Sequence, residues 1–444
     1  MSLRRPLHHA YLAARQGEVL RLLARMERDE WLSTDEIRAR QWERLRCLLV
    51  HAGRHVPFYR AFFAEAGLDP ASLRGPEVLK TLPVVTKEML RTRRDEFRSD
   101  DAASRGATSN ATGGSTGEPL TFFQDDLYRL HRQAAMYRGF RWCGWRIGGP
   151  LAYLWGSDID SRAHRGLGAV RDALLGITWI DAFTLDDRAI DAVLGRLERA
   201  DPDILIGYAS SLSHLARRSL ALEKGPRLRA VETSAELLTP EARGDIERAF
   251  RTKVLDRYGC REGGVISHEC GAEKGWHINT ETVWIETDTE GRLLMTTLMN
   301  YSMPLIRYRN EDLVELEDRR CPCGRGLPLM TAVIGRRSDV ILSPSGRAIH
   351  GEFFTHLFYG VPGVIEFQVV QKTMVDLLIR VVARGEFTPQ QRSRIETAIR
   401  EHADAAFRIR WETLAEIPRG PSGKHRFTLS EVSGVDAASP RAPR

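Results

Sequence analysis

Apolar and polar positions alternate along the chain with two different periods, and these periods predict its elements. Near the N-terminus the apolar residues recur at helical spacing, which predicts one helix over residues 1–30 and a second over 35–51. Ser33 or Thr34 is a candidate cap for the second helix. Residues 56–59 contain a proline and are expected to end that helix.

The middle of the chain has short apolar runs that alternate with amphipathic stretches. Strands are predicted at 150–156, 174–180, 204–208, 228–234 and 253–258, and helices at 126–142, 185–199, 211–222 and 239–250. This alternation is typical of βαβ units with a mostly parallel sheet. Because ligands bind such sheets beyond the carboxyl ends of the strands, we expect Tyr208, residues 234–236 and residues 258–262 on one rim.

A β-rich stretch follows, and the character of the sequence changes again near residue 339. Hairpin strands are predicted at 277–278, 283–286, 292–297 and 305–309. Further on, strands are predicted at 364–370, 375–382 and 409–416, with an amphipathic helix at 388–407. The pattern therefore predicts an α/β fold with a large N-terminal part and a small C-terminal α+β unit that has its own core.

Composition narrows the function classes. The 65 basic and 59 acidic residues give a net charge of +6, and they are interleaved, which is unlike the concentrated basic face of a nucleic-acid binder. No apolar run approaches the roughly 20 residues of a membrane span, and no signal peptide is recognisable, so a cytoplasmic location is the default expectation. Six cysteines in 444 residues do not indicate a disulfide framework.

One glycine-rich segment stands out, Thr112-Gly113-Gly114-Ser115-Thr116-Gly117-Glu118-Pro119. Its glycines allow a close backbone approach to a ligand, and its hydroxyls and N–H groups suit polyphosphate oxygens. No lysine follows the last glycine, so this is not a P-loop of the GxxxxGK[ST] type. The alternative is a solvent-exposed linker, since Gly/Ser/Thr runs often form one.

Four further stretches occur in a fixed order with this segment. They are Tyr258-Gly259-Cys260-Arg261-Glu262, Tyr308-Arg309-Asn310-Glu311-Asp312, Gly335-Arg336-Arg337-Ser338-Asp339 and Pro418-Arg419-Gly420-Pro421-Ser422-Gly423-Lys424. Together the five motifs resemble those of the adenylate-forming superfamily of acyl-CoA synthetases and peptide-synthetase adenylation domains. Within it, the chain is most similar to the phenylacetate–CoA ligase branch, with its coenzyme F390 synthetase and capsule-protein relatives. The helical N-terminus with its Val-Pro-Phe-Tyr-Arg segment also fits that branch.

The resemblance implies a domain organisation and a reaction. The expected domains are an N-terminal adenylate-forming domain (1–338), with mostly parallel sheets and a β-rich subdomain, a mobile C-terminal domain (339–433) and a disordered tail (434–444), with Asp339 as the hinge. A carboxylate would attack the α-phosphate of ATP, pyrophosphate would leave, and a nucleophile would capture the acyl-adenylate. Coenzyme A is the expected acceptor.

The resemblance also implies roles for individual residues. Glu262 would hold Mg²⁺, a cation that prefers oxygen ligands. Lys424 would supply positive charge to the reacting carboxylate and α-phosphate, delivered by the mobile domain. Nucleotide-binding roles fall on Thr112, Gly113, Gly114, Ser115, Thr116 and Gly117 for the phosphates, on Ser234, Ala235 and Glu236 for the adenine pocket, on Asp312 for the ribose, and on Gly259 and Arg336. Tyr258 would pack on the adenine or on the acyl group.

Three departures from the family pattern keep alternatives open, the post-hinge segment for the acyl acceptor, and Arg261 and Glu311 for catalysis as a whole. Arg261 stands where relatives usually have threonine, and Glu311 stands where they have glycine. The segment after the hinge, 343–351, resembles the pantetheine loop of CoA-dependent relatives only loosely. Two alternatives therefore stay open: transfer of the acyl group to an amine, hydroxyl or carrier protein, and a catalytically inert nucleotide-binding scaffold.

The cysteines carry a separate prediction. Cys321-Pro-Cys323-Gly324 is a tight knuckle that would present two thiolates to one metal, and thiolate pairs need partners to complete a tetrahedral zinc site. We expect Cys270, His277, Cys321 and Cys323 to bind a structural zinc, with Cys260 and His268 as reserve ligands. The alternative is four unrelated reduced thiols and imidazoles. The sequence leaves open which acid is activated and whether the chain forms a homodimer.

Overall fold

The structure is a computed structural model, and it describes part of the chain. The described residues are 4–111, 120–155, 166–180, 187–238, 240–272, 275–336, 340–345, 348–350, 354, 357–358, 361–385, 387–418 and 426–432. The chain divides into two compact units, one of Met1–Asn310 with Val314–Val333 and the other of Glu311–Leu313 with Ile334–Arg444. The predicted hinge Asp339 and the predicted tail 434–444 lie outside the described residues.

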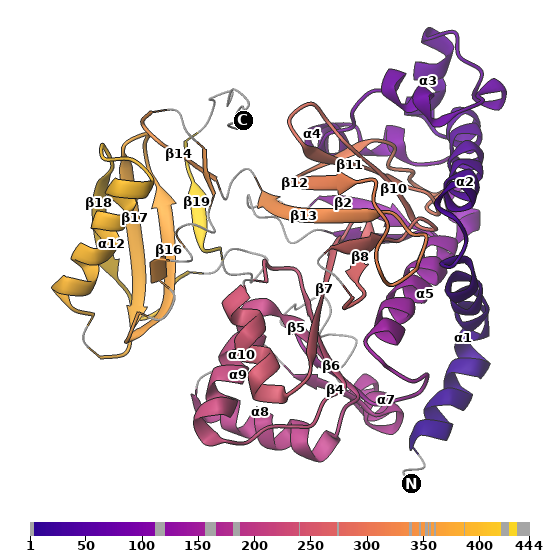
Figure 1. Cartoon of the computed structure of the whole chain (residues 1–444). Helices are drawn as coiled ribbons and strands as arrows, with labels where there is room; N and C mark the ends of the chain where they lie inside the picture. Colours follow the sequence, from indigo (N-terminus) through magenta and orange to yellow (C-terminus); the bar gives the residue numbers. More distant parts are fainter. Residues whose placement is uncertain are drawn as a thin grey trace. The chain divides into compact units, whose positions relative to one another are not determined.

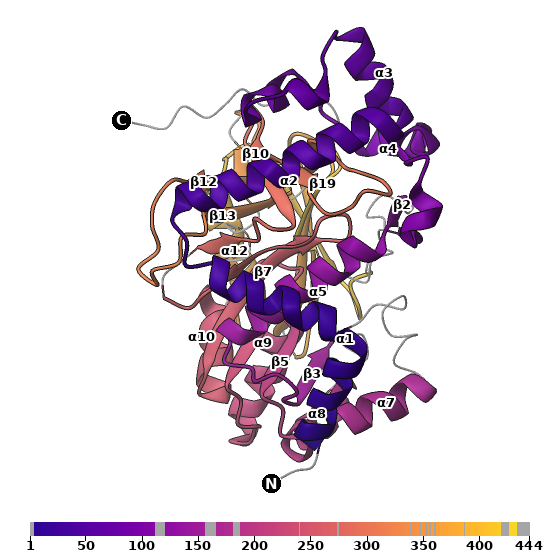
Figure 2. The same cartoon turned by 90° about the vertical axis from the view of Figure 1, so that its right-hand side faces the viewer.

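The first unit contains long helices at its N-terminus and shorter ones between strands (Figures 1 and 2). Ser33 caps α2 in a capping box, because its hydroxyl accepts a hydrogen bond from the N–H of Glu36 while the Glu36 carboxylate accepts one from the N–H of Ser33. The helices are α1 (Arg4–Asp29), α2 (Thr34–His55), α3 (Pro57–Glu65), α4 (Lys87–Thr92), α5 (Asp126–Trp142), α7 (Leu167–Leu175), α8 (Asp187–Ala200), α9 (Ala209–Leu222) and α10 (Pro240–Phe250). Short 3₁₀ turns lie at Pro70–Ser72, Pro76–Thr81, Arg94–Phe97 and Ala102–Arg105.

Among the described residues, eleven strands form one large mixed sheet in the order β10-β11-β12-β13-β9-β8-β7-β6-β5-β3-β4. These strands are β3 (Leu151–Leu154), β4 (Ile177–Ile180), β5 (Ile204–Tyr208), β6 (Ala230–Ser234), β7 (Lys253–Cys260), β8 (Gly264–Glu269), β9 (Trp276–Ile278), β10 (Val283–Thr287), β11 (Arg292–Thr297), β12 (Tyr308–Glu317) and β13 (Leu329–Arg336). Neighbouring strands from β4 through β7 are parallel, whereas β7 pairs antiparallel with β8 and β8 with β9. The predicted β-rich stretch thus continues the same sheet.

Helices cover both faces of the parallel part, because its strands are apolar on both sides. Leu205 packs in one cluster with residues of α8, α9 and α10, while Ile204 and Ile206 pack in another with residues of α1 and α5. Figure 2 shows α1, α2 and α5 lying across one side of this unit. Each fully buried side chain of this kind contributes about 2 kcal/mol to folding. The result is the α/β architecture that the sequence pattern predicts.

The second unit is a small α+β assembly with a core of its own. Its four-stranded sheet has the order β18-β17-β16-β19, and α12 contributes Ile395 and Ile399 to the core beneath it. A two-stranded ladder of β14 and β15 accompanies this sheet. The elements are β14 (Val340–Leu342), β15 (Ala348–His350), β16 (Val364–Gln371), β17 (Asp376–Ala383), α12 (Pro389–His402), β18 (Arg408–Thr413) and β19 (Thr428–Ser430), with a separate hairpin of β1 (Thr108–Ala111) and β2 (Thr121–Gln124) in the first unit.

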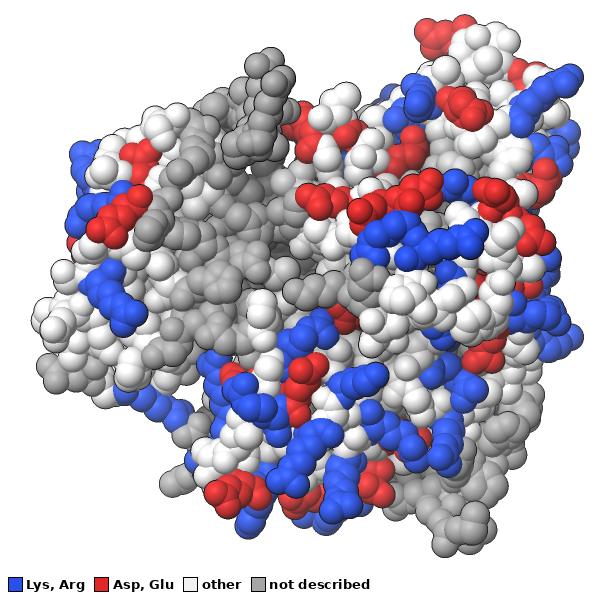
Figure 3. Space-filling model, viewed as in Figure 1, with Lys and Arg blue, Asp and Glu red and all other residues white. Residues whose placement is uncertain are grey.

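Several predicted elements differ in their bounds, among them the helix predicted at 388–407, which is Pro389–His402, and the strand predicted at 409–416, which is Arg408–Thr413; two others differ in a more informative way. The apolar run at 174–180 is not one strand, because α7 continues through Leu175 and Gly176 then ends it at φ +72°, so that β4 begins at Ile177. The strand predicted at 305–309 begins at Tyr308 and runs on to Glu317. None of the helices among the described residues is long and apolar enough to cross a membrane. On the face in Figure 3, basic and acidic side chains are interspersed.

Candidate functional site

Three parallel strands end at the same edge of the sheet and bring the predicted rim residues together. Tyr208, the last residue of β5, pairs with Ser234, the last residue of β6, and Ser234 in turn pairs with Arg257 of β7. The segments 234–236 and 258–262 therefore leave neighbouring strands at one edge, as the topology predicts.

The segment after β6 has an unusual backbone. Ala235 adopts φ +69°, in the left-handed region that L-residues with a Cβ occupy at a cost of about 1 kcal/mol or more. Ser234 before it is buried, and Glu236 after it is half-buried. A turn held in this conformation by its surroundings has the character of a ligand-binding loop.

The turn between β7 and β8, which we call the Glu262 turn (residues 261–263), positions a buried carboxylate. The hydroxyl of Tyr308 donates a hydrogen bond to Oε1 of Glu262 at 3.0 Å, and the hydroxyl of Tyr128 donates one to the main-chain carbonyl of Glu262 at 3.2 Å. Glu262 is 7% exposed. Since both its backbone and its side chain are held, the carboxylate is oriented, as a ligand to a hard cation needs to be.

The stem of the glycine-rich segment is anchored on the same turn. Ala111 of β1 pairs with Thr121 of β2, which closes the chain on either side of residues 112–119. Gln124 donates from Nε2 to the carbonyl of Arg261 at 3.0 Å and accepts at Oε1 from Asn110 at 3.0 Å. The stem and the Glu262 turn are thus neighbours. The candidate phosphate-binding residues Thr112, Gly113, Gly114, Ser115, Thr116 and Gly117 themselves lie outside the described residues.

Tyr258 and Gly259 lie where β7 is irregular. The strand register shifts between them, and a Cβ at position 259 would approach the carbonyl oxygen of Gly264 to 2.3 Å, so only glycine fits there. Tyr258 accepts a hydrogen bond at its hydroxyl from Nδ2 of Asn310 at 2.9 Å. The motif spacing at Tyr258-Gly259 therefore reflects a backbone requirement as well as a candidate ligand contact.

Of the remaining candidate residues, the structure describes only some. Asp312 is a buried residue of β12, and the division into units assigns it to the second unit. Arg336 ends β13, and its side chain is not described. Asp339 and Lys424 lie outside the described residues.

An aromatic and charged group completes the rim, and Arg257 in it was not singled out from the sequence. The rings of Trp155 and Tyr208 lie 4.5 Å apart, and the guanidinium carbon of Arg257 lies 5.8 Å from the Trp155 ring centroid. Arg257 donates from Nε to Ser234 at 3.0 Å and pairs with the fully buried Glu232 at 3.0 Å. Burial raises the pKa of Glu232 to about 7, against the opposing effect of Arg257. The sequence signal that could have singled out Arg257 is a charged residue within the predicted strand 253–258.

The predicted zinc ligands converge in space. The ligand atoms of Cys270, His277, Cys321 and Cys323, which we call the cysteine cluster, all lie within 4.8 Å of one another. The sulfurs of Cys270 and Cys321 are 3.6 Å apart, and Nε2 of His277 is 3.2 Å from the sulfur of Cys323. Gly324 turns the knuckle at φ +86°. Three thiolates and one imidazole form a donor set that suits tetrahedral zinc.

The surroundings of His277 prepare it as a ligand. Its Nδ1–H donates to the carbonyl of Leu327 at 3.2 Å, which leaves the lone pair on Nε2, the atom beside Cys323. Burial lowers the pKa of His277 to about 4, so the imidazole is neutral at pH 7. The reserve ligands lie elsewhere: Cys260 contacts Met295, and His268 faces Glu232.

Arg325 joins the cysteine cluster to the N-terminal helices. Its main-chain N–H donates to the sulfur of Cys323 at 3.5 Å, and its side-chain Nε donates to Glu30 at 2.7 Å. The guanidinium also lies 4.7 Å from the ring of Trp142 and 4.9 Å from that of Trp31. Trp142 packs edge-on against His277 at 5.6 Å. The cluster is therefore enclosed by the α1–α2 junction and by the end of α5.

Known proteins resemble the chain over most of its length. Phenylacetate-coenzyme A ligase of Thermus thermophilus is 26% identical over 443 residues, covering 90% of this chain and 98% of the relative. The enzyme of the same name from Escherichia coli is 29% identical over 337 residues, covering 70% and 74%, and protein CapK of Staphylococcus aureus is 24% identical over 381 residues, covering 80% of each. The CapK C-terminal domain family matches residues 341–431.

Solved structures share the fold. A 2-hydroxyisobutyryl-CoA ligase, solved in the postadenylation state with 2-HIB-AMP, matches with a TM-score of 0.72 at 20% identity, covering 91% of this chain and 92% of that one. An anthranilate CoA ligase solved with anthranoyl-AMP matches with a TM-score of 0.51 at 16% identity, covering 80% of each chain. Over most of its length the chain is thus similar to phenylacetate–coenzyme A ligases and to CapK, and it shares the fold of solved CoA ligases that hold an acyl-adenylate.

Proposed function

We propose that the chain is an ATP-dependent, AMP-forming acid ligase that activates a carboxylate as its acyl-adenylate and transfers the acyl group to coenzyme A. The relatives named as phenylacetate-coenzyme A ligases support the overall reaction. The solved neighbours that hold an acyl-adenylate, one of them together with coenzyme A, support the two half-reactions.

One observation carries the proposal: a buried, oriented Glu262 lies beside the stem of the glycine-rich segment. Tyr308 fixes its carboxylate, and Gln124 of β2 bonds the adjoining carbonyl of Arg261. A carboxylate in this position would hold Mg²⁺, which would neutralise developing charge on the phosphates. Residues 112–117 would hold the β- and γ-phosphates with backbone N–H groups and hydroxyls.

The other candidate residues have roles in the same proposal. Asp312 would accept hydrogen bonds from both ribose hydroxyls. Tyr258, Gly259 and residues 234–236 would line the adenine pocket. Lys424, carried by the C-terminal domain, would place its ammonium on the carboxylate and the α-phosphate, with Asp339 as the hinge and Arg336 near the nucleotide.

Acid-dependent exchange between ATP and pyrophosphate tests adenylation. We expect exchange with at least one member of a panel of aryl, arylacetic, hydroxy and aliphatic acids, and we expect Lys424→Ala to reduce it by at least about 100-fold, the scale of losing a transition-state charge. The control is Lys372→Ala, which removes a lysine that pairs with Glu431 at the surface of the second unit. Exchange with no acid, or full activity in Lys424→Ala, would reject the assignment.

The acyl acceptor is tested separately. Release of AMP that depends on coenzyme A supports the thioester step. Release that depends instead on an amine, a hydroxyl compound or a carrier protein would replace coenzyme A as the acceptor while leaving adenylation in place. Tight ATP binding with no turnover of any acid would support the inert scaffold.

We also propose that the cysteine cluster holds a structural zinc ion. Four N and S ligands form a closed site without an open position for substrate, and the site lies against the α1–α2 junction through Arg325. Elemental analysis of the purified protein should find about one zinc per chain. Absence of zinc from protein prepared without chelators, with the four thiol and imidazole groups reactive to modifying reagents, would contradict the proposal.

A further inference from the structure

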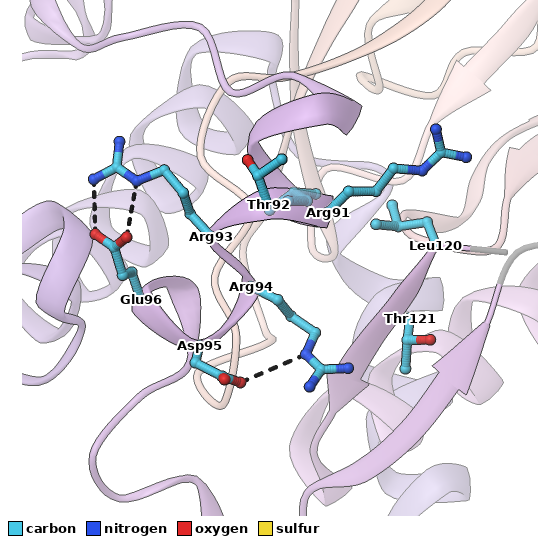
Figure 4. Close-up of a pocket in the computed structure, with 9 residues that line it drawn as sticks. Arg91, Thr92, Arg93, Arg94, Asp95, Glu96, Leu120 and Thr121 are labelled. Carbon is cyan, nitrogen blue, oxygen red and sulfur yellow. Dashed lines mark hydrogen bonds and ion pairs between the residues drawn. The ribbon is translucent and has the colours of Figure 1, made fainter. Parts of the chain in front are cut away.

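A cavity of about 500 Å³ lies beside the start of β2 (Figure 4). The end of α4 and the 3₁₀ turn Arg94–Phe97 line one side of it, and Leu120 and Thr121 line the other. Leu120 directly follows the glycine-rich segment in the sequence. We call this cavity the arginine pocket, after Arg91 and Arg94.

Two guanidinium groups supply the charge of the pocket. In Figure 4, Arg91 and Arg94 extend towards the side formed by Leu120 and Thr121. Arg93 instead points away and makes two hydrogen bonds to Glu96, at 2.9 and 2.7 Å, so that these two charges neutralise each other. Three arginines and two acids line the pocket, so its lining carries an excess of one basic side chain.

The acid beside Arg94 does not cancel this charge. The carboxylate of Asp95 lies 3.5 Å from Nε of Arg94, is 83% exposed, and leaves the terminal nitrogens of the guanidinium towards the pocket. Exposed pairs of this kind are weak because water screens them. An anion with two or more oxygens can compete for the terminal N–H groups.

The ring of Phe123, outside the lining of the pocket, lies near Arg94 and also near Arg98, which does not line the pocket. The guanidinium carbon of Arg98 lies 4.7 Å from the ring centroid of Phe123, and that of Arg94 lies 5.9 Å from it. Phe123 belongs to β2, whose end contacts the Glu262 turn through Gln124. Arg94 is thereby held near the strand that connects the pocket to the candidate active site.

We propose that the arginine pocket binds a phosphate group of a substrate or product of the ligase reaction. Each guanidinium group can match phosphate oxygens in bidentate geometry, and the partial exposure of both keeps the cost of desolvating them low. The source of the phosphate rests on the proposed function: it is either the pyrophosphate released from ATP or the phosphates of coenzyme A. The shared chemistry is a multiply charged phosphate anion.

Calorimetric titration of the full chain separates these sources without requiring turnover. The ligands are sodium pyrophosphate, coenzyme A and dephospho-coenzyme A, which lacks only the 3′-phosphate. The proteins are wild type, Arg91→Ala, Arg94→Ala and, as a control with the same change of charge, Arg98→Ala, whose guanidinium lies on Phe123 outside the lining of the pocket. Thermal unfolding of each variant checks that it is folded.

We expect binding of one ligand to weaken about tenfold in Arg91→Ala and in Arg94→Ala and by less than twofold in Arg98→Ala, because one charge-assisted hydrogen bond is lost from the pocket. Weakening for pyrophosphate alone identifies the leaving group. Weakening for coenzyme A but not for dephospho-coenzyme A identifies its 3′-phosphate, and weakening for both identifies its diphosphate. Unchanged binding of every ligand, or equal weakening in Arg98→Ala, overturns the proposal.

The same data distinguish a failure of this proposal from a failure of the proposed function. If wild-type protein catalyses acid-dependent exchange but the pocket variants bind all three ligands normally, the pocket assignment is wrong and the ligase assignment stands. If pyrophosphate binding depends on Arg91 and Arg94 but no acid supports exchange, the pocket stands and the ligase assignment is wrong.

Discussion

The Glu262 turn and the cysteine cluster lie at the two ends of the same short strand, and they are built in opposite ways. Strand β8 begins at Gly264, just after the turn, and ends at Glu269, just before Cys270. In the cluster, four ligand atoms converge on one another and backbone groups enclose them. In the turn, a single carboxylate is oriented by a neighbouring hydroxyl, at the edge where the parallel strands end.

The contrast predicts different consequences of damage at the two ends of β8. A closed, four-ligand metal site would stabilise the fold around it, whereas a single buried carboxylate that holds a cation would contribute to chemistry and little to folding. We therefore expect damage to the cluster to appear as lost stability, and damage to the turn to appear as lost rate in a protein that still folds.

The largest effect is expected from breaking the cluster. Cys323→Ser should abolish zinc binding and lower the free energy of unfolding by about 4 kcal/mol, or the thermal midpoint by about 10 °C, because a structural metal contributes directly to folding. Elemental analysis and thermal unfolding measure both quantities. Cys47→Ser, which changes an exposed cysteine outside the cluster, is the control and should change neither. A stable Cys323→Ser variant without metal would show that the cluster is not structural.

Breaking the turn should reduce activity and leave stability almost unchanged. Glu262→Gln keeps an oxygen that can accept from Tyr308 but removes the charge, so acid-dependent ATP–pyrophosphate exchange should fall by about 100-fold or more. The thermal midpoint should stay within about 2 °C of wild type, as for a substitution that retains its hydrogen bond. Exchange above half of the wild-type rate would exclude Glu262 from the reaction.

Buried titratable groups at the middle of β8 make the folding stability depend on pH. His268 of β8 lies 3.8 Å from Glu232 of β6, whose pKa is raised by burial from 4.5 to about 7. Since the native state holds this proton more tightly than the unfolded chain, stability falls as pH rises from about 4.5 to 7. His268 acts in the opposite direction, because burial lowers its pKa and stability falls as pH decreases below 6.5.

Glu232→Gln isolates the carboxyl contribution. The difference in unfolding free energy between variant and wild type should shift in favour of the variant by up to about 3 kcal/mol between pH 5 and pH 8. Urea unfolding at the two pH values measures it, with the exposed Glu77→Gln as a control. A difference that does not change with pH would mean that Glu232 titrates normally.

The smallest effect is expected from the hydroxyl that orients the carboxylate. Tyr308→Phe removes one hydrogen bond to Glu262, which is worth about 1 kcal/mol, so exchange should fall about fivefold with a smaller change in the affinity for ATP. Steady-state measurement of kcat and KM separates the two. A loss as large as that of Glu262→Gln would place Tyr308 in direct contact with the reacting groups.

The sequence predicted most where local patterns decide the structure. Strand β5 was predicted with its observed bounds, because turn-forming and charged residues bracket a short apolar run. The run at 174–180 was misread because a helix end and a strand start are both apolar there, and only the left-handed Gly176 separates them. Strand β8 was missed because its buried residues include the polar Ser267 and His268, one on each face of the sheet.

The candidate sites show the same limit. Residue type was enough to group the four residues of the cysteine cluster, because cysteine and histidine are the ligands that zinc prefers, although Cys270 and Cys321 are 51 positions apart. The sequence could not show that Arg257 links Glu232 to Ser234, or that Arg94 and Thr121 line one pocket, because no motif marks these contacts.

The hydrogen bond from Arg325 to Glu30 has a consequence for how the protein is made. These two residues are 295 positions apart, so the loop after α1 leaves the ribosome long before its partner does. Leu23 and Met26 of α1 pack with residues of α5 and of β5, β6 and β7, so their apolar faces stay uncovered until those elements have been made. The contact of Glu30 closes later still, because Arg325 follows tens of seconds after Glu30 at about 5–20 residues per second.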